Sequence, residues 1–212
     1  MTIGWNPVLL NRYIAPGIAE FSACELPDLK AEHPQADHWL ANHFLNTVFR
    51  AEYEGKHRQY AVNIIYRAQA CFDQYHQARD LTLEYLEQSD PDNPKSRIYF
   101  AAITTWEAYF LNLQTFVEVL CRLTGKRIFE QADDSPEQRA YSIANTIKHW
   151  GGSIGRDEHH DDDTIPLWLT NTGFRTRTEH LAYAEFAALI RESAVAAEDL
   201  VDPYERTKKA DD

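Results

Sequence analysis

The chain has 212 residues, of which 44% are hydrophobic and 25% are charged, proportions that are typical of a globular domain and exclude a disordered chain. Only eight residues are glycine, which argues against an all-β fold built on many tight turns. The 21 Lys and Arg residues against 33 Asp and Glu residues give a net charge of −12, which disfavours broad binding to nucleic acid or to an anionic membrane unless cations gather locally.

The cysteine content and the terminal sequence indicate the compartment. Cys24, Cys71 and Cys121 are odd in number and lack C-x-x-C spacing, which predicts free thiols in a reducing environment. The first residues have neither a basic stretch nor a long apolar run, so we expect no signal peptide. The most apolar segment, residues 98–123, carries three charged residues and is predicted to be a core helix that does not span a membrane. We therefore expect a cytoplasmic protein.

The first half of the chain predicts an arm and two helices. Residues 1–34 contain several prolines together with apolar residues, which predicts an ordered arm with one or two short helices lying across the body. Apolar residues at helical spacing predict one helix over residues 35–54, ended by Gly55, and a long helix over residues 56–88.

The next segment predicts two further helices. Asn93 as a cap with Pro94 at the first helical position predicts a central helix that extends to about residue 123, with Gly125 as its C-terminal cap. This helix is apolar on most sides, so we expect it to be the most buried one. Ser135, Pro136 and Gln138 predict the start of another helix through a capping box, and Gly151-Gly152 is its expected end.

The last third predicts a β-hairpin followed by a helix. Two β-prone runs, residues 165–170 and 174–177, flank an Asn-Thr-Gly turn, and Thr176 with Glu179 forms a second capping box that opens a helix over about residues 178–201. The fold class that follows is all-α, an antiparallel helical bundle of about five helices with a small β-hairpin before the last one. The expected organisation is an irregular arm (1–34), the bundle domain (35–201) and a flexible charged tail (202–212).

The segment around His149 offers the first candidate for chemistry. Asn145 and His149 are four residues apart and share a helix face, while Lys148 lies on an adjacent face. An imidazole beside an amide and an ammonium can act as a general acid or base near a phosphate, because histidine titrates near neutral pH. The other interpretation is structural: His149 interacts with the helix C-terminus while Asn145 and Lys148 face water.

The run Asn145-Thr146-Ile147-Lys148-His149, between a long apolar helix and a final helix, resembles the signature of the HEPN superfamily over roughly residues 94–201. This resemblance implies a small all-helical domain, and active members are metal-independent endoribonucleases of toxin–antitoxin, abortive-infection or CRISPR-linked systems. It implies a homodimer in which two motifs form one RNA-cleaving cleft. On this basis His149 would be the acid–base group, Asn145 would orient a phosphate, and Lys148 or an arginine of the second copy would supply charge.

The sequence departs from this signature at the position of its arginine. Ala144 stands where the family has Arg, and Arg139 lies ten residues before His149, so the resemblance implies a degenerate member with weak or absent cleavage. Basic residues that could form an RNA-binding cleft are Lys126, Arg127, Arg139, Lys148, Arg156, Arg175 and Arg177. We also expect Trp168 and Phe174 to be exposed and to contribute to the dimer contact. A protein partner such as an antitoxin is a further expectation.

Two alternative functions remain open at this point. The acidic and histidine-rich loop 157–163, or the pairs Glu54 with His57 and Asp73 with His76, could serve a metal-dependent bundle enzyme. The protein could also be a purely structural, partner-binding module. The chain lacks the phosphate-binding P-loop, the dinucleotide fingerprint and the serine-hydrolase motif, so we expect no cofactor, and we expect no bound metal.

Overall fold

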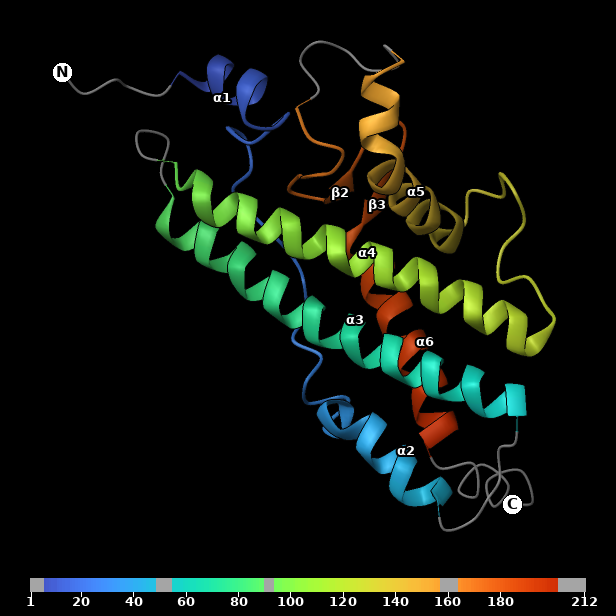
Figure 1. Ribbon diagram of the computed structural model, residues 1–212. Coiled ribbons are helices and arrows are strands. Elements are labelled where there is room, and N and C mark those ends of the chain that lie inside the picture. Colours follow the sequence, from blue (N-terminus) through green and yellow to red (C-terminus); the bar gives the residue numbers. More distant parts are fainter. Residues whose placement is uncertain (1–5, 49–54, 90–93, 157–163, 202–212) are drawn as a thin grey trace.

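The computed structural model describes residues 6–48, 55–89, 94–156 and 164–201, and it is mostly helical with one small antiparallel sheet (Figure 1). The expectation of a broadly all-α fold is confirmed, and the described residues contain one more α-helix than the five expected. These helices are α1 (Pro7–Tyr13), α2 (Trp39–Val48), α3 (Gly55–Gln88), α4 (Ser96–Thr124), α5 (Pro136–Ile154) and α6 (Tyr183–Val201).

Helices α3 and α4 form a long antiparallel hairpin that is the scaffold of the molecule (Figure 1). The apolar stripe of α3 is the one that its sequence periodicity predicts, and each of its members is buried. These residues are Ala61, Ile64, Ile65, Ala68, Cys71, Phe72 and Tyr75. Among the residues that the structure describes, no helix combines the length and apolar character needed to cross a bilayer.

Helix α6 is the most buried of the longer helices, which corrects the expectation for the central segment. Nine of the 19 residues of α6 are buried, against nine of the 29 residues of α4. The reason is placement, because α6 packs against α2, α3 and α5. The last turns of α4 instead leave side chains partly or fully exposed after Phe116.

The sheet has three strands in the order β1 (Trp168–Leu169), β2 (Gly173–Arg175) and β3 (His180–Ala182), all antiparallel. The predicted hairpin is therefore present as β1 and β2, and β3 is an addition to it. The expected start of the last helix at residue 178 is wrong: the hydroxyl of Thr176 accepts hydrogen bonds from the amides of Thr178 and Glu179 within a tight turn, and α6 begins at Tyr183.

Other helix ends show where local signals were sufficient. Ser135 caps α5 as expected, accepting a hydrogen bond from the Gln138 amide at 3.2 Å, and Gly125 ends α4 with a left-handed φ of 68°.

Two other expected helix ends differ in the structure. Pro94 precedes α4 and is not its first residue, while Asn93 lies outside the described residues. Gly151-Gly152 does not end α5 as expected: neither glycine has a positive φ, and the helix continues to Ile154.

The helix expected over residues 35–54 is shorter in the described residues. A 3₁₀ turn, η1 (Ala36–His38), precedes α2, and residues 49–54 lie outside the described part of the chain. The tail 202–212 also lies outside it. Gly55, the expected end of that helix, instead begins α3 with a φ of 55°.

The N-terminal arm is described from Asn6 onward, and side chains of the body hold it through hydrogen bonds to its backbone. The Tyr75 hydroxyl donates to the carbonyl of Pro27 at 2.6 Å, and Arg79 donates to the carbonyl of Leu26 at 2.9 Å. Asn171, at the tip of the β1–β2 hairpin, accepts hydrogen bonds from the amides of Ser22 and Ala23 at 2.8 and 3.0 Å. The arm thus bridges α3 and the sheet.

Aromatic side chains fill the space where α4, the sheet and α6 meet. Phe174 packs edge-on against Trp106 and Phe186, with ring centroids 4.8 and 4.7 Å apart. Phe174 is fully buried and Trp168 is only 8% exposed, so the expectation that both rings are exposed at a dimer contact is wrong. Phe174 turns toward α4 because one face of the sheet covers the core. Trp168 is paired in register with Arg175 and therefore lies on the opposite face of the sheet, beside the N-terminal arm.

We expect Phe174→Ala to lower the free energy of unfolding by about 3–5 kcal/mol, because it opens a cavity among rings that cannot fully collapse. Urea denaturation monitored by circular dichroism measures this loss. The matched control is Phe44→Ala, whose ring is 40% exposed and should cost much less. Equal losses for the two variants would contradict the central role of the cluster.

Candidate functional site

Helix α5 carries the sequence-predicted motif and turns its residues in different directions. Asn145 is partly buried and faces α4, where its side-chain oxygen accepts a hydrogen bond from Gln114 Nε2 at 2.7 Å. Lys148 and His149 are exposed on the outside of the helix. The amide oxygen of Asn145 is therefore engaged within the fold, and the imidazole of His149 is open to solvent.

A groove of about 670 Å³ runs between α4 and α5 beside Asn145. Arg122 and Arg127 line it, as does Glu118, which accepts a hydrogen bond from the Tyr141 hydroxyl at 3.1 Å. Arg127 pairs with Glu130 at 3.6 Å at a site where both side chains are largely exposed. Neither His149 nor Lys148 is among the residues that line the groove, so the motif is divided between the groove and the outer surface.

The position that departs from the family signature is a core position here. Ala144 has no exposed surface, and it belongs to the buried face of α5 with Ala140 and Ile143. A guanidinium at this position would have to be buried without a partner already in place, which is strongly unfavourable. This chain therefore presents a small apolar residue where the signature needs a cation.

Arg139 is engaged by internal partners. Its guanidinium donates to Glu185 at 2.7 Å and to the carbonyl of His180 at 2.9 Å, and Asp134 lies 3.6 Å away. Only 16% of the Arg139 side chain is exposed. These contacts join α5 to the start of α6, which favours a structural role for Arg139 over contact with RNA.

Arg175 and Arg177 lie together in a different part of the surface. They line an open hollow of about 870 Å³ with Arg12 of α1, and we call this region the arginine hollow. Asp and Glu are absent from its described lining. The other residues that line it are Val8, Asn11, Pro16, Gly17, Trp168, Thr170 and Thr176.

Strand alternation explains why two arginines point into this hollow. Phe174 and Thr176 are buried, whereas Arg175 and Arg177 between and after them are exposed, which is the period of two expected of extended chain. Gly173 allows β3 to approach β2 closely, because a Cβ atom there would lie 2.2 Å from the carbonyl oxygen of Leu181. Sequence reasoning missed Arg12, because only the folded arm brings it beside the hairpin.

Arg156 stands apart from both the groove and the hollow. It is exposed just after α5, and its guanidinium donates to the Ser153 hydroxyl at 3.4 Å. It lines neither of the two regions described above. The basic residues selected from the sequence therefore do not gather in one cleft.

Three buried histidines have partners within the fold, and one of them belongs to a candidate metal pair. His76, of the Asp73 and His76 pair, lies 3.8 Å from Asp28. His33 lies 2.9 Å from Glu198, and His43 bonds to the carbonyl of Leu200 at 3.1 Å. Within the described ranges, no group of three or more His, Cys, Asp or Glu residues is placed to hold a metal ion. Loop 157–163 and Glu54 lie outside those ranges.

Comparison of this chain with protein-family models, with curated proteins and with solved structures finds no significant match. The functional argument therefore rests on the residues and their geometry.

The pair of Arg139 and Glu185 supports a test of the structural role. Burial raises the pKa of Glu185, but hydrogen bonds from Arg139 and from the Ala182 amide outweigh burial and leave it below its ordinary 4.5. We expect Arg139→Met to lower the free energy of unfolding at pH 7 by about 1–2 kcal/mol, because a partly buried carboxylate loses its charged donor. Urea denaturation measures the change, and Arg127→Met is the matched control for an exposed pair.

The pH dependence of this difference has a definite sign. A carboxylate whose pKa is lowered by folding contributes stability above its unfolded pKa, and this contribution is lost as the pH falls through the folded pKa. The difference between wild type and Arg139→Met should therefore shrink as the pH falls from 7 to below 4. A difference that grows over this range would show that the Glu185 carboxylate is not what Arg139 stabilises.

Proposed function

We propose that this protein is a HEPN-like helical module of the bacterial cytoplasm that binds single-stranded RNA in the arginine hollow, as part of a defence or toxin–antitoxin type of system. The observation that carries the proposal is the convergence of Arg12, Arg175 and Arg177 on one open hollow in a chain of net charge −12. Local gathering of cations is the condition under which an acidic protein can bind a polyanion.

The chemistry of the hollow suits a nucleotide strand. Guanidinium groups bind phosphate oxygens through paired hydrogen bonds and also stack on bases. Thr170 and Asn11 add polar groups to the same lining. Single-stranded RNA is recognised by this combination of phosphate contacts and stacking on flat side chains.

Cleavage, in this proposal, is slow or absent. Transition-state charge in phosphoryl transfer needs a cation close to the acid–base group, and Ala144 supplies none beside His149. Any residual cleavage uses His149 as the acid–base group, Asn145 to orient a phosphate, and Lys148 or an arginine of a second copy for charge. We propose a homodimer that brings two α5 helices together, and an antitoxin as a further partner.

Fluorescence anisotropy with a labelled single-stranded RNA tests the binding site. We expect the double variant Arg175→Ala/Arg177→Ala to weaken binding about tenfold or more, and to reduce the slope of log K against log salt by about 1.4, since each phosphate contact contributes about 0.7. The control is Arg122→Ala/Arg127→Ala, which removes the same charge from the α4–α5 groove. If this control weakens binding as much as or more than the hairpin variant, the RNA site is not the arginine hollow.

The second test concerns chemistry at His149. With wild-type protein we expect little cleavage of RNA, insensitive to EDTA, and we expect His149→Ala to reduce what remains by about 10²–10⁴-fold. Stability should change by less than about 0.5 kcal/mol, because the side chain is exposed. His38→Ala, at another exposed histidine, is the control. Cleavage that EDTA abolishes would favour the metal-dependent alternative, and cleavage that survives His149→Ala would exclude the proposed mechanism.

A further inference from the structure

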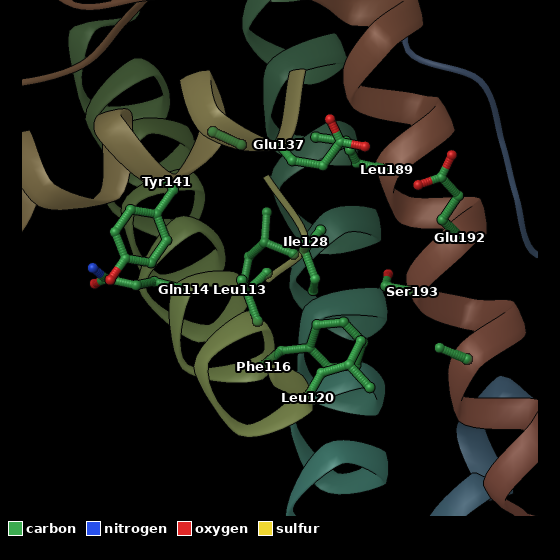
Figure 2. A pocket seen from close by; sticks show the side chains of 13 residues that line it. Leu113, Gln114, Phe116, Leu120, Ile128, Glu137, Tyr141, Leu189, Glu192 and Ser193 are labelled. Atoms are coloured by element: carbon green, nitrogen blue, oxygen red, sulfur yellow. The ribbon is translucent and has the colours of Figure 1, made fainter. Parts of the chain in front are cut away.

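A third cavity lies between α4, α5 and α6 and has a volume of about 190 Å³ (Figure 2). It is separate from the arginine hollow and adjoins the α4–α5 groove. Its wall is mostly apolar. Figure 2 shows Phe116 and Leu120 toward one end and the carboxylates of Glu137 and Glu192 toward the other. The remaining lining residues are Leu113, Gln114, Val117, Ile128, Ala140, Tyr141, Leu189, Ser193 and Ala196.

Three of the polar side chains in this lining are engaged by groups of the protein. Gln114 donates to Asn145 at 2.7 Å, and the Tyr141 hydroxyl donates to Glu118 at 3.1 Å. The hydroxyl of Ser193 donates to the carbonyl of Ile190 at 2.8 Å. These donors are therefore not directed at a ligand, and the interior of the cavity offers mainly apolar contact.

The two glutamates in the lining, Glu137 and Glu192, differ from these three residues in their hydrogen bonding. Within the part of the chain that the structure describes, neither Glu137 nor Glu192 has a hydrogen-bonding or ion-pair partner among its side-chain contacts. Burial raises the pKa of Glu192, and the nearby charge of Glu137 raises it further. Glu137 lies in the first turn of α5, where the helix dipole favours a carboxylate. Two like charges thus lie toward the same end of an apolar cavity, and a cation there would relieve their repulsion.

The volume limits the size of the occupant. Cavities for drug-sized ligands are typically about 300–1,000 Å³, whereas an apolar cavity of about 150 Å³ is sufficient for benzene. A cavity of about 190 Å³ therefore accommodates one aromatic ring or a short alkyl chain with a small polar group. An anionic ligand of the same size would place its charge near the two carboxylates and would be repelled.

We propose that the cavity between α4, α5 and α6 binds a small organic ammonium ion, with its single ring or short alkyl chain against Phe116 and Leu120 and its ammonium group between Glu137 and Glu192. The apolar part gains from leaving water, and the charge is matched by two carboxylates. This site is independent of the proposed RNA contact, since the two share no lining residue.

Isothermal titration calorimetry with phenethylammonium chloride tests this proposal on the full chain. Two isosteric probes separate the contributions: 2-phenylethanol keeps the ring without the charge, and phenylacetate reverses the charge. We expect the ammonium ion to bind most tightly, the alcohol more weakly, and the carboxylate not measurably. Equal affinity for the ammonium ion and the alcohol would overturn the role of the glutamates, and absence of binding by the ammonium ion would overturn the site.

Variants place the binding within the cavity. Glu137→Gln/Glu192→Gln should weaken phenethylammonium by about fivefold or more, at about two- to fivefold for each partly exposed carboxylate, and leave 2-phenylethanol unchanged. Glu25→Gln/Glu87→Gln removes the same charge from exposed positions elsewhere and should have no effect. Ala196→Phe should abolish binding of both probes by filling the cavity, and Ala196→Leu serves if the larger residue prevents folding.

Two results would reject the assignment. One is unchanged ammonium affinity in Glu137→Gln/Glu192→Gln, and the other is unchanged affinity in the folded cavity-filling variant. RNA titration of Glu137→Gln/Glu192→Gln separates this proposal from the proposed function. RNA affinity in that variant should equal or slightly exceed that of wild type, whichever way the amine titrations turn out.

Discussion

The edge-to-face packing of aromatic rings around Phe186 is the contact on which the rest of the structure depends. Phe174 of β2 lies 4.7 Å from Phe186 of α6 between ring centroids, and Tyr109 of α4 lies 4.9 Å from it. Such pairs contribute about 0.5–1.5 kcal/mol beyond the burial of their area. Because Phe174 is held inside this cluster, its neighbours in the strand are fixed with it, and Arg175 is held outward toward the arginine hollow. The core therefore determines the orientation of the proposed binding surface.

The elements whose signal is local could be predicted from the sequence. The apolar stripe of α3 and the Ser135 cap of α5 depend on residues only a few positions apart, so periodicity and capping preferences were sufficient. Thr176 and Glu179 show the limit of this reasoning. The hydrogen bond from the Glu179 amide to the Thr176 hydroxyl occurs both at helix starts and in tight turns. In this chain the segment forms a tight turn, because β2 on one side of it pairs with β3 on the other.

The candidate site was less predictable because its geometry depends on distant segments. The Arg139 partner Glu185 is 46 residues away, and Arg12 reaches Arg175 only through the folded arm. Sequence spacing correctly places Asn145 and His149 on one helix, but it does not show that Gln114 of α4 bonds to Asn145. The local sequence pattern could therefore indicate which residues are candidates. Which of them lie together could be seen only in the tertiary structure.

The hydrogen bonds between Asn171 and the N-terminal arm join two segments that are synthesised at very different times. Asn171 contacts Ser22 across 149 residues of sequence, so the arm leaves the ribosome long before this anchor exists. At about 5–20 residues per second, the interval is on the order of ten seconds. Throughout it, the apolar side chains of Leu10, Ile18 and Phe21 lack the finished surface that buries them. The nascent arm therefore exposes apolar side chains until the rest of the core has been made.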